Sequence, residues 1–214
     1  MQEYRVIAER CQASIIVRRS EFIAQAAPVE DEEEAWQFVE EIRERHREAT
    51  HNVYAWRVGL ADELIRSSDD GEPAGTAGRP VLEVIQREAL HNVVVVVTRY
   101  FGGILLGAGG LVRAYSKAAT EVLRVAPKAL CQPRQRLRIR LDYGALGKLQ
   151  NEIIQIGGAI EEADYGAVVV LDVLLPLTAV DFISQTALDL TRGEARIEQL
   201  GIEYVMVTGV DEKK

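Results

Sequence analysis

The stretch of chain that decides the fold runs from residue 68 to residue 116. Residues 68–83 read SDDGEPAGTAGRPVLE, five valines occupy Val93–Val97, and residues 98–116 read TRYFGGILLGAGGLVRAYS. An uncharged valine run of this length predicts a buried strand. The glycines after it lead into an amphipathic pattern, so we expect a turn and then a helix whose first N–H groups are free to bind an anion.

Glycine is the most distinctive residue of both segments. It lets the backbone approach a ligand closely and adopt a positive φ, at an entropic cost that an ordinary surface loop does not need to bear. The chain has no G-x-x-x-x-G-K-[ST] loop, and Val112 stands where a dinucleotide fingerprint starting at Gly107 needs its last glycine. We therefore interpret the segments as a surface for phosphate or another anion. Tight turns required only for packing are the alternative.

The composition is that of an ordinary globular protein, and 214 residues suit one large domain or two small ones. The apolar runs are too short to cross a bilayer, and the N-terminus lacks the apolar region of a signal peptide. Cys11 and Cys131 form no C-x-x-C pair, so we expect a cytoplasmic location. A net charge of −8 disfavours indiscriminate nucleic-acid binding, but Val97–Arg140 holds nine Lys/Arg against the single acid Glu121.

The first 127 residues alternate between strand and helix patterns. Residues 31–47 give the clearest helix, since Asp31 and Glu34 match a capping box and arginines follow near its end. The other predicted elements are strands over 2–10, 13–26, 53–60 and 92–99, helices over 80–89 and 111–125, a long loop over 61–78, and a linker over 127–133. A loop of that length in a compact domain is usually functional or disordered.

The remainder of the chain gives a cleaner pattern. Predicted strands cover 134–142, 159–165, 167–175 and 197–207, with helices over 143–156 and 176–191. This βαββαβ order is that of a ferredoxin-like unit. The fold class is therefore α+β, with one domain at 1–127 and a second at 134–214, each a sheet covered by helices on one side.

Four arginines alternate with apolar residues along the first strand of that second domain. They are Arg134, Arg136, Arg138 and Arg140. Side chains two apart share a face, and in a ferredoxin-like sheet the face opposite the helices is open. A row of arginines on that open face can bind phosphates. The alternative is cross-strand pairing with Glu161, Glu198 or Glu203.

Three carboxylates, Asp69, Asp70 and Glu72, cluster around Gly71. Hard cations such as Mg²⁺ bind such oxygens, so a magnesium-assisted phosphoryl-transfer or hydrolytic site is one interpretation. An Asp-Gly turn with solvated carboxylates, or with carboxylates paired to nearby arginines, is the other. The sequence predicts no other cofactor.

The two long motifs, preceded by Ser20–Ala24 and Ala49–Asn52, resemble the IMPACT family, specifically its bacterial two-domain members. The likeness covers residues 1–127 strongly, and the βαββαβ tail matches the second domain of these members. It implies an N-terminal α/β sandwich like the second domain of a small-subunit ribosomal protein and domain IV of elongation factor G. It also implies a tail like domain V of that factor, and a role near translation or RNA.

Eukaryotic members regulate an initiation-factor kinase by binding its activator through an extra N-terminal RWD domain. We expect no such domain here, because the chain starts close to the first motif, so that partner is not implied. The positions of this chain that match the family motif are His51, Asp69, Asp70, Glu72, Thr76, Arg99, Tyr100, Arg113 and Ser116.

The preferred interpretation is an RNA- or ribosome-binding protein with a regulatory role in translation. Arg99, Arg113 and Lys117 would hold phosphate, and Tyr100 and Phe101 would form a stacking face. The predicted anion- or RNA-binding residues are His51, Thr76, Arg79, Arg99, Tyr100, Gly102, Gly103, Gly107, Gly109, Gly110, Arg113, Ser116, Lys117, Arg136 and Arg138. The alternatives are a magnesium-dependent enzyme acting on a phosphorylated small molecule and a protein-interaction module.

Overall fold

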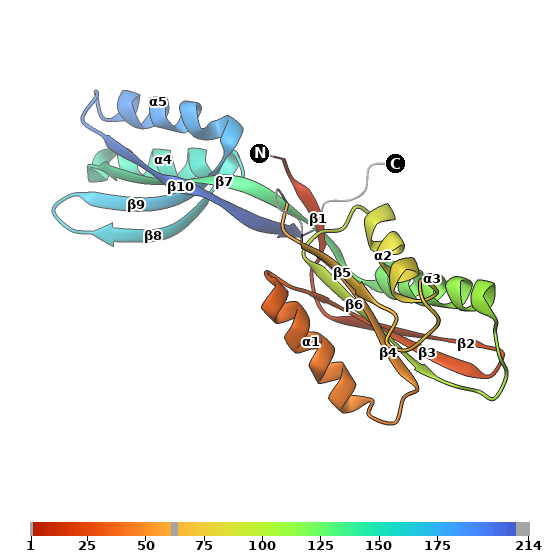
Figure 1. Cartoon of the computed structure of the whole chain (residues 1–214). Helices are drawn as coiled ribbons and strands as arrows, with labels where there is room; N and C mark the ends of the chain where they lie inside the picture. Colours follow the sequence, from red (N-terminus) through yellow and green to blue (C-terminus); the bar gives the residue numbers. More distant parts are fainter. Residues whose placement is uncertain (1, 61–63, 209–214) are drawn as a thin grey trace. The chain divides into compact units, whose positions relative to one another are not determined.

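The computed structural model describes residues 2–60 and 64–208 of the chain. These residues form two compact units, one containing Tyr4–Leu130 and the other Cys131–Val207, called the N-terminal and the C-terminal unit below. Figure 1 shows their helices and strands. No helix among the described residues is long and apolar enough to span a membrane.

A five-stranded antiparallel sheet forms the centre of the N-terminal unit, in the order β2-β3-β6-β4-β5. Its strands are β2 (Cys11–Val17), β3 (Ser20–Pro28), β4 (His51–Val58), β5 (Leu64–Ser68) and β6 (Val93–Tyr100). The remaining elements are a short strand β1 (Tyr4–Ile7) and the helices α1 (Glu32–Arg45), α2 (Gly78–Arg87) and α3 (Ala108–Val125). The valine run occupies the central strand β6, as predicted.

Helices cover both faces of this sheet, so the prediction of one covered face is wrong for the N-terminal unit. Val93, Val95 and Val97 pack in a core with α2 and α3, whereas Val94 and Val96 pack in a second core with α1. Side chains of a strand alternate between faces, so a continuous valine run supplies both cores. Figure 1 shows α1 on the opposite side of the sheet from α2 and α3.

Two strands of this sheet give no clear sequence signal. Residues 13–26 form a hairpin of β2 and β3, not the single strand predicted, with a turn at Arg18 and Arg19 whose φ values are 45° and 66°. Such turns usually contain Asn or Gly, which are missing here. The predicted loop 61–78 contains β5, an exposed edge strand with no apolar alternation. Residues 61–63 of that loop lie outside the described residues.

The C-terminal unit has the predicted βαββαβ order, and the α+β fold class is confirmed. Its elements are β7 (Lys128–Leu141), α4 (Tyr143–Gln155), β8 (Ala159–Tyr165), β9 (Val169–Pro176), η1 (Leu177–Ala179), α5 (Val180–Leu190) and β10 (Arg196–Thr208). β10 pairs with β7, β7 with β9 and β9 with β8, which is the ferredoxin-like strand order. One core contains both helices and the inward side chains of the sheet, so here the helices cover one face.

The predicted linker at 127–133 contains the division between the two units, but it is not a separate loop, because most of it belongs to β7. Ala129 and Cys131 are buried at alternate positions of this strand, as expected for a chain that contributes to a sheet. Two prolines, Pro127 and Pro133, hid that alternation, since proline is normally a sign of a strand end. The division between the two units falls after Leu130, within the strand.

Candidate functional site

The two glycine-rich segments meet at one pocket in the N-terminal unit. Its volume is about 410 Å³, within the range of small-molecule sites. The pocket is lined by Arg99 near the end of β6, by Phe101 just after this strand, and by residues 50–51, 71–73, 105–108 and 111. The antiparallel pairing of β4 with β6 places His51 opposite Arg99, and this register brings the separate motifs together.

A buried ion pair lines the pocket. Arg99 is 5% exposed, and its Nη1 donates to Oε1 of Glu72 at 2.6 Å. The hydroxyl of Tyr115, on α3, donates to the same oxygen at 2.7 Å. Burial and the Glu72 carboxylate both raise the pKa of Tyr115, so its hydroxyl stays protonated. These contacts link β6, α3 and the turn at Glu72. A buried carboxylate without partners would be strongly unfavourable, so the three segments have to stay together.

His51 lies beside this ion pair in a fixed tautomer. Its Nδ1 is 2.7 Å from the carbonyl oxygen of Asp70. A carbonyl oxygen only accepts hydrogen bonds, so Nδ1 carries the proton and Nε2 is the acceptor in the neutral ring. Nε2 is 3.9 Å from Oε2 of Glu72, beyond hydrogen-bond distance. Among the described residues, Oε2 of Glu72 therefore has no donor, although Oε1 has two.

The carboxylates predicted to bind magnesium have separate partners. Asp69 accepts three backbone N–H groups from residues 75–78, at 2.7 to 3.0 Å. Burial opposes the ionisation of Asp69, but these donors outweigh it and lower its pKa. Asp70 accepts from the backbone N–H of Asn52 at 2.6 Å and from Arg43 at 3.1 Å. No group of three or more His, Cys, Asp or Glu side chains in the described part of the chain could hold a metal ion.

The motif glycines serve close packing at some positions and turns at others. A Cβ on Gly102 would lie 2.0 Å from the backbone of Arg19, and one on Gly78 would lie 2.6 Å from the backbone of β5. Gly103 and Gly107 have φ values of 83° and 72°, which other residues rarely adopt. Close packing therefore explains the glycines at Gly78 and Gly102, as the alternative to an anion-binding surface predicted. Gly103 and Gly107 instead form turns in the segment that leads into α3.

The N-terminus of α3 begins at the pocket without a capping side chain. Ala108 lines the pocket, and the first turn, which includes Gly109 and Gly110, contains no acidic residue. The guanidinium of Arg113 reaches back to 3.6 Å from the Cβ position of Gly109, and Lys117 follows one turn later. Both cations are exposed, and neither has an ion pair among the described residues. Arg113 belongs to the second turn of α3, but its guanidinium reaches back toward the first turn, where a cation opposes the helix dipole unless an anion offsets it.

Tyr100 and Phe101 do not form one stacking face, so that prediction is wrong. The hydroxyl of Tyr100 lies 2.9 Å from Nδ1 of His46, at the end of α1, whereas Phe101 lines the pocket. Consecutive residues at a strand end point in opposite directions. Phe101 alone presents an aromatic surface at the pocket.

Most other predicted residues, including Arg113 and Lys117, also lie outside the pocket lining. Thr76 donates to the carbonyl oxygen of Pro73 at 2.6 Å and so fixes the turn between β5 and α2. Arg79 is exposed and pairs with Glu83 at 3.0 Å on the same helix. Ser116 lies on α3, where its carbonyl group accepts a hydrogen bond from a threonine hydroxyl.

The arginine row on β7 is largely paired within the sheet. Arg138 donates two hydrogen bonds to Asp172, each 2.7 Å long, and Arg136 donates to Glu203 at 2.6 Å. Arg134 donates to a backbone carbonyl oxygen at 2.8 Å. These contacts agree with the cross-strand alternative, although Asp172 was not among the partners expected. Arg136 and Arg138 have carboxylate partners and need no phosphate to offset their charge.

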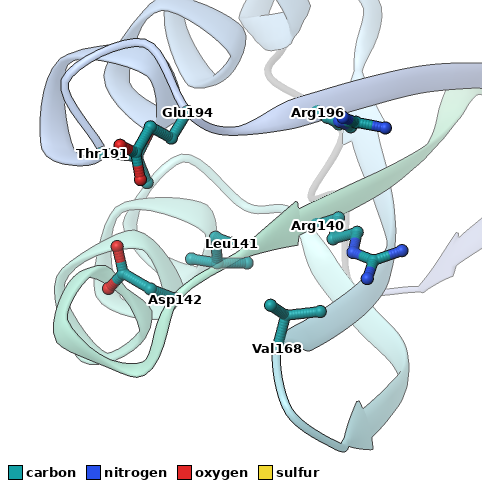
Figure 2. A pocket seen from close by; sticks show the side chains of 7 residues that line it. All are labelled: Arg140, Leu141, Asp142, Val168, Thr191, Glu194 and Arg196. Atoms are coloured by element: carbon teal, nitrogen blue, oxygen red, sulfur yellow. The ribbon is translucent and has the colours of Figure 1, made fainter.

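The fourth arginine of the row, Arg140, borders a separate hollow of about 300 Å³ in the C-terminal unit. Figure 2 shows Arg140 and Arg196 toward one side of this hollow and Asp142, Thr191 and Glu194 toward the other. Asp142 also caps α4. Because the hollow carries charges of both signs, it does not concentrate positive charge as the start of α3 does.

Sequence reasoning missed Tyr115 and the apolar side of the pocket. Tyr115 belongs to the apolar stripe of α3, and its need for a buried hydrogen-bond partner was the one available signal. Leu105, Leu106 and Leu111 line the pocket, but leucines near a helix start are equally expected in a core. Nothing in their spacing distinguishes the two roles.

Fold and site together define an α+β protein of two units whose glycine-rich motifs build a ligand-sized pocket around a buried ion pair. The Impact N-terminal domain family matches residues 18–123, and the domain of unknown function DUF1949 matches residues 139–194. The chain is 35% identical to IMPACT family member YvyE of Bacillus subtilis (strain 168) over 205 residues, covering 96% of this chain and 94% of that protein. The chain belongs to the IMPACT family.

Two further relatives show how far the similarity extends. IMPACT family member YigZ of Escherichia coli (strain K12) is 37% identical over 183 residues, 85% of this chain and 90% of that protein. Protein IMPACT of Oryctolagus cuniculus is 42% identical over 95 residues, 42% of this chain and 29% of that protein. A solved structure described as "Crystal structure of an hypothetical protein" superposes with a TM-score of 0.64 at 33% identity, covering 94% of this chain and 98% of that one.

Removing one partner of the buried ion pair should strongly destabilise the protein. Arg99→Met leaves Glu72 buried without its charge partner, so we expect the free energy of unfolding to fall by about 3–5 kcal/mol. Tyr115→Phe removes one hydrogen bond to a charged group and should lower it by about 2 kcal/mol. Denaturant unfolding measures both effects.

The double variant Arg99→Met/Glu72→Gln should be destabilised by less than the sum of its single changes, and additive effects would contradict the pairing.

Arg138 should control the acid stability of the C-terminal unit. Its hydrogen bonds lower the pKa of Asp172 below the ordinary value of 3.8. The pair therefore stabilises the fold above that pH, and the stabilisation is lost as the pH falls through the folded-state pKa. Arg138→Gln should raise the pKa of Asp172 and move acid unfolding to higher pH, measured by NMR titration and circular dichroism. Arg134→Gln is the control, and identical acid midpoints in the two variants would count against this account.

Proposed function

We propose that the protein binds RNA through its N-terminal unit and thereby regulates translation in the cytoplasm. The observation that carries this proposal is the uncapped start of α3 at the pocket, where the guanidinium of Arg113 reaches back toward Gly109 and the exposed Lys117 follows one turn after Arg113. The N–H groups, the helix dipole and the two cations all favour a bound phosphate. Membership of the IMPACT family supports the connection to translation.

Further cations lie near the same end of the sheet. The turn between β2 and β3 carries the exposed Arg18 and Arg19, and the backbone of Arg19 is in close contact with Gly102, which follows the pocket residue Phe101. The protein as a whole has a net charge of −8, so phosphate contacts have to be local and few. Asp69 and Asp70 accept from backbone donors and Arg43, and one oxygen of Glu72 accepts from Arg99 and Tyr115, which favours RNA binding over the enzyme alternative.

Arg113→Ala and Lys117→Ala should each weaken RNA binding. We expect the slope of log affinity against log salt to fall by about one unit for each phosphate that the variant no longer binds. Since Arg113 is exposed and has no ion pair among the described residues, its removal should change the free energy of unfolding by less than about 0.5 kcal/mol. Fluorescence anisotropy with labelled RNA over a salt series measures the slope, and thermal unfolding measures stability.

The matched control for these variants is Arg124→Ala. Arg124 lies at the other end of α3 and pairs with Glu121 at 3.0 Å, so its removal takes the same charge from the same helix far from the pocket. RNA affinity and salt slope should be those of the unmodified protein. If all three variants bind RNA equally well, the start of α3 is not the phosphate site.

A further inference from the structure

An anion site alone does not explain the apolar lining of the pocket. Phe101 is 46% exposed and Leu105 is 81% exposed, and both line the pocket together with Leu106 and Leu111. Apolar side chains exposed next to unpaired cations suit a ligand with both a flat apolar part and an anionic part. A nucleotide unit of an RNA strand has both parts, because its base is a planar ring and its phosphate is charged.

Phe101 is held in a position that favours stacking. The guanidinium of Arg99 lies 5.4 Å from the centroid of its ring, and the backbone N–H of Phe101 donates to Oγ1 of Thr50 at 3.2 Å. Arg99 is itself fixed by Glu72 and lies 5.5 Å from the ring of Phe22. The ring is therefore supported from the protein side, and its remaining exposed surface is available to a base.

Two hydrogen-bond acceptors lie at the same pocket. Oε2 of Glu72 accepts from no described residue and is not one of the fully buried unpaired side-chain atoms, so it is accessible from the pocket that Glu72 lines. Nε2 of His51 is the acceptor nitrogen of the neutral ring, because Nδ1 donates to Asp70. An exocyclic amino group of a base would supply the missing donor. A uracil presents a carbonyl oxygen at the same position, and this oxygen cannot donate to either acceptor.

We infer that the pocket takes one unstacked base of single-stranded RNA, with adenine or cytosine preferred over uracil. The base stacks on Phe101 and donates its amino group to Glu72 and His51, while the start of α3 holds a neighbouring phosphate. This inference rests on the proposed RNA binding and specifies the form of RNA that is bound. The bases of a duplex are already stacked and paired, so a duplex cannot place one in a pocket of about 410 Å³.

The first test compares three labelled probes by fluorescence anisotropy: oligoadenylate, oligouridylate and the duplex of the two. The unmodified protein should bind oligoadenylate more tightly than either other probe. Phe101→Ala should weaken oligoadenylate binding about tenfold, within the range for removal of one base–aromatic stack. Phe182→Ala is the matched control, because Phe182 on α5 is 51% exposed and lies in the C-terminal unit. Its affinity for oligoadenylate should be unchanged.

The second test changes the base preference itself. In Glu72→Gln, the amide oxygen can still accept from Arg99 and Tyr115, and the amide nitrogen then replaces Oε2 with a donor. The ratio of oligoadenylate to oligouridylate affinity should fall, even if overall stability falls as well. Because this readout is a ratio measured on folded protein, a purely structural role of Glu72 would not move it.

The outcomes separate the two proposals. If RNA binds but the three probes bind alike, or Phe101→Ala binds as tightly as Phe182→Ala, the base pocket is wrong and the proposed RNA binding remains. If the unmodified protein binds none of the probes at low salt, both the base pocket and the proposed function are wrong. Tighter binding to the duplex than to oligoadenylate would also overturn the base pocket.

Discussion

The ion pair between Arg99 and Glu72 is the interaction on which the pocket depends. It joins a residue of the central strand to a residue of the turn after β5, and Tyr115 adds α3 through the same carboxylate oxygen. Three segments that are distant in sequence are therefore fixed by one buried carboxylate. The pocket exists because these segments meet without filling the space between Phe101 and the start of α3.

The cations discussed above form two groups: arginines that pair with a carboxylate of the protein, and cations that are available to a ligand. Arg99, Arg136 and Arg138 each have a carboxylate partner, so their charge is offset within the protein. Arg113 and Lys117 have no such partner among the described residues and lie on the outer face of α3. An anionic ligand at the pocket would therefore meet its opposite charge at the helix start, while Arg99 supports the aromatic ring beneath it.

The sequence predicted those parts of the fold whose residues carry their own signal. The valine run specified a buried central strand, and the βαββαβ order of the C-terminal unit followed from clean apolar periodicity ended by glycine turns. The hairpin turn at Arg18 and Arg19 could not be found, because its residue types are not those that favour positive φ. The edge strand β5 was missed because exposed residues do not alternate.

The sequence pointed to part of the pocket but not to its contacts. The motifs pointed to His51, Glu72 and Arg99, all of which line the pocket. Whether Glu72 pairs with Arg99 or binds a cation depends on distances across the fold, which residue spacing along the chain does not determine. In the same way, the bidentate contact of Arg138 with Asp172 depends on the pairing of β7 with β9.

The most direct measurement is a map of backbone amide NMR shifts on addition of single-stranded oligoadenylate. The account predicts that shift changes concentrate at residues 50–51, 71–73 and 101–113, which surround the pocket and begin α3. The arginine strand β7 and its neighbour β10 should change little. Changes centred on β7 and β10, with the pocket residues unaffected, would contradict the central claim that the N-terminal pocket is the RNA-binding site.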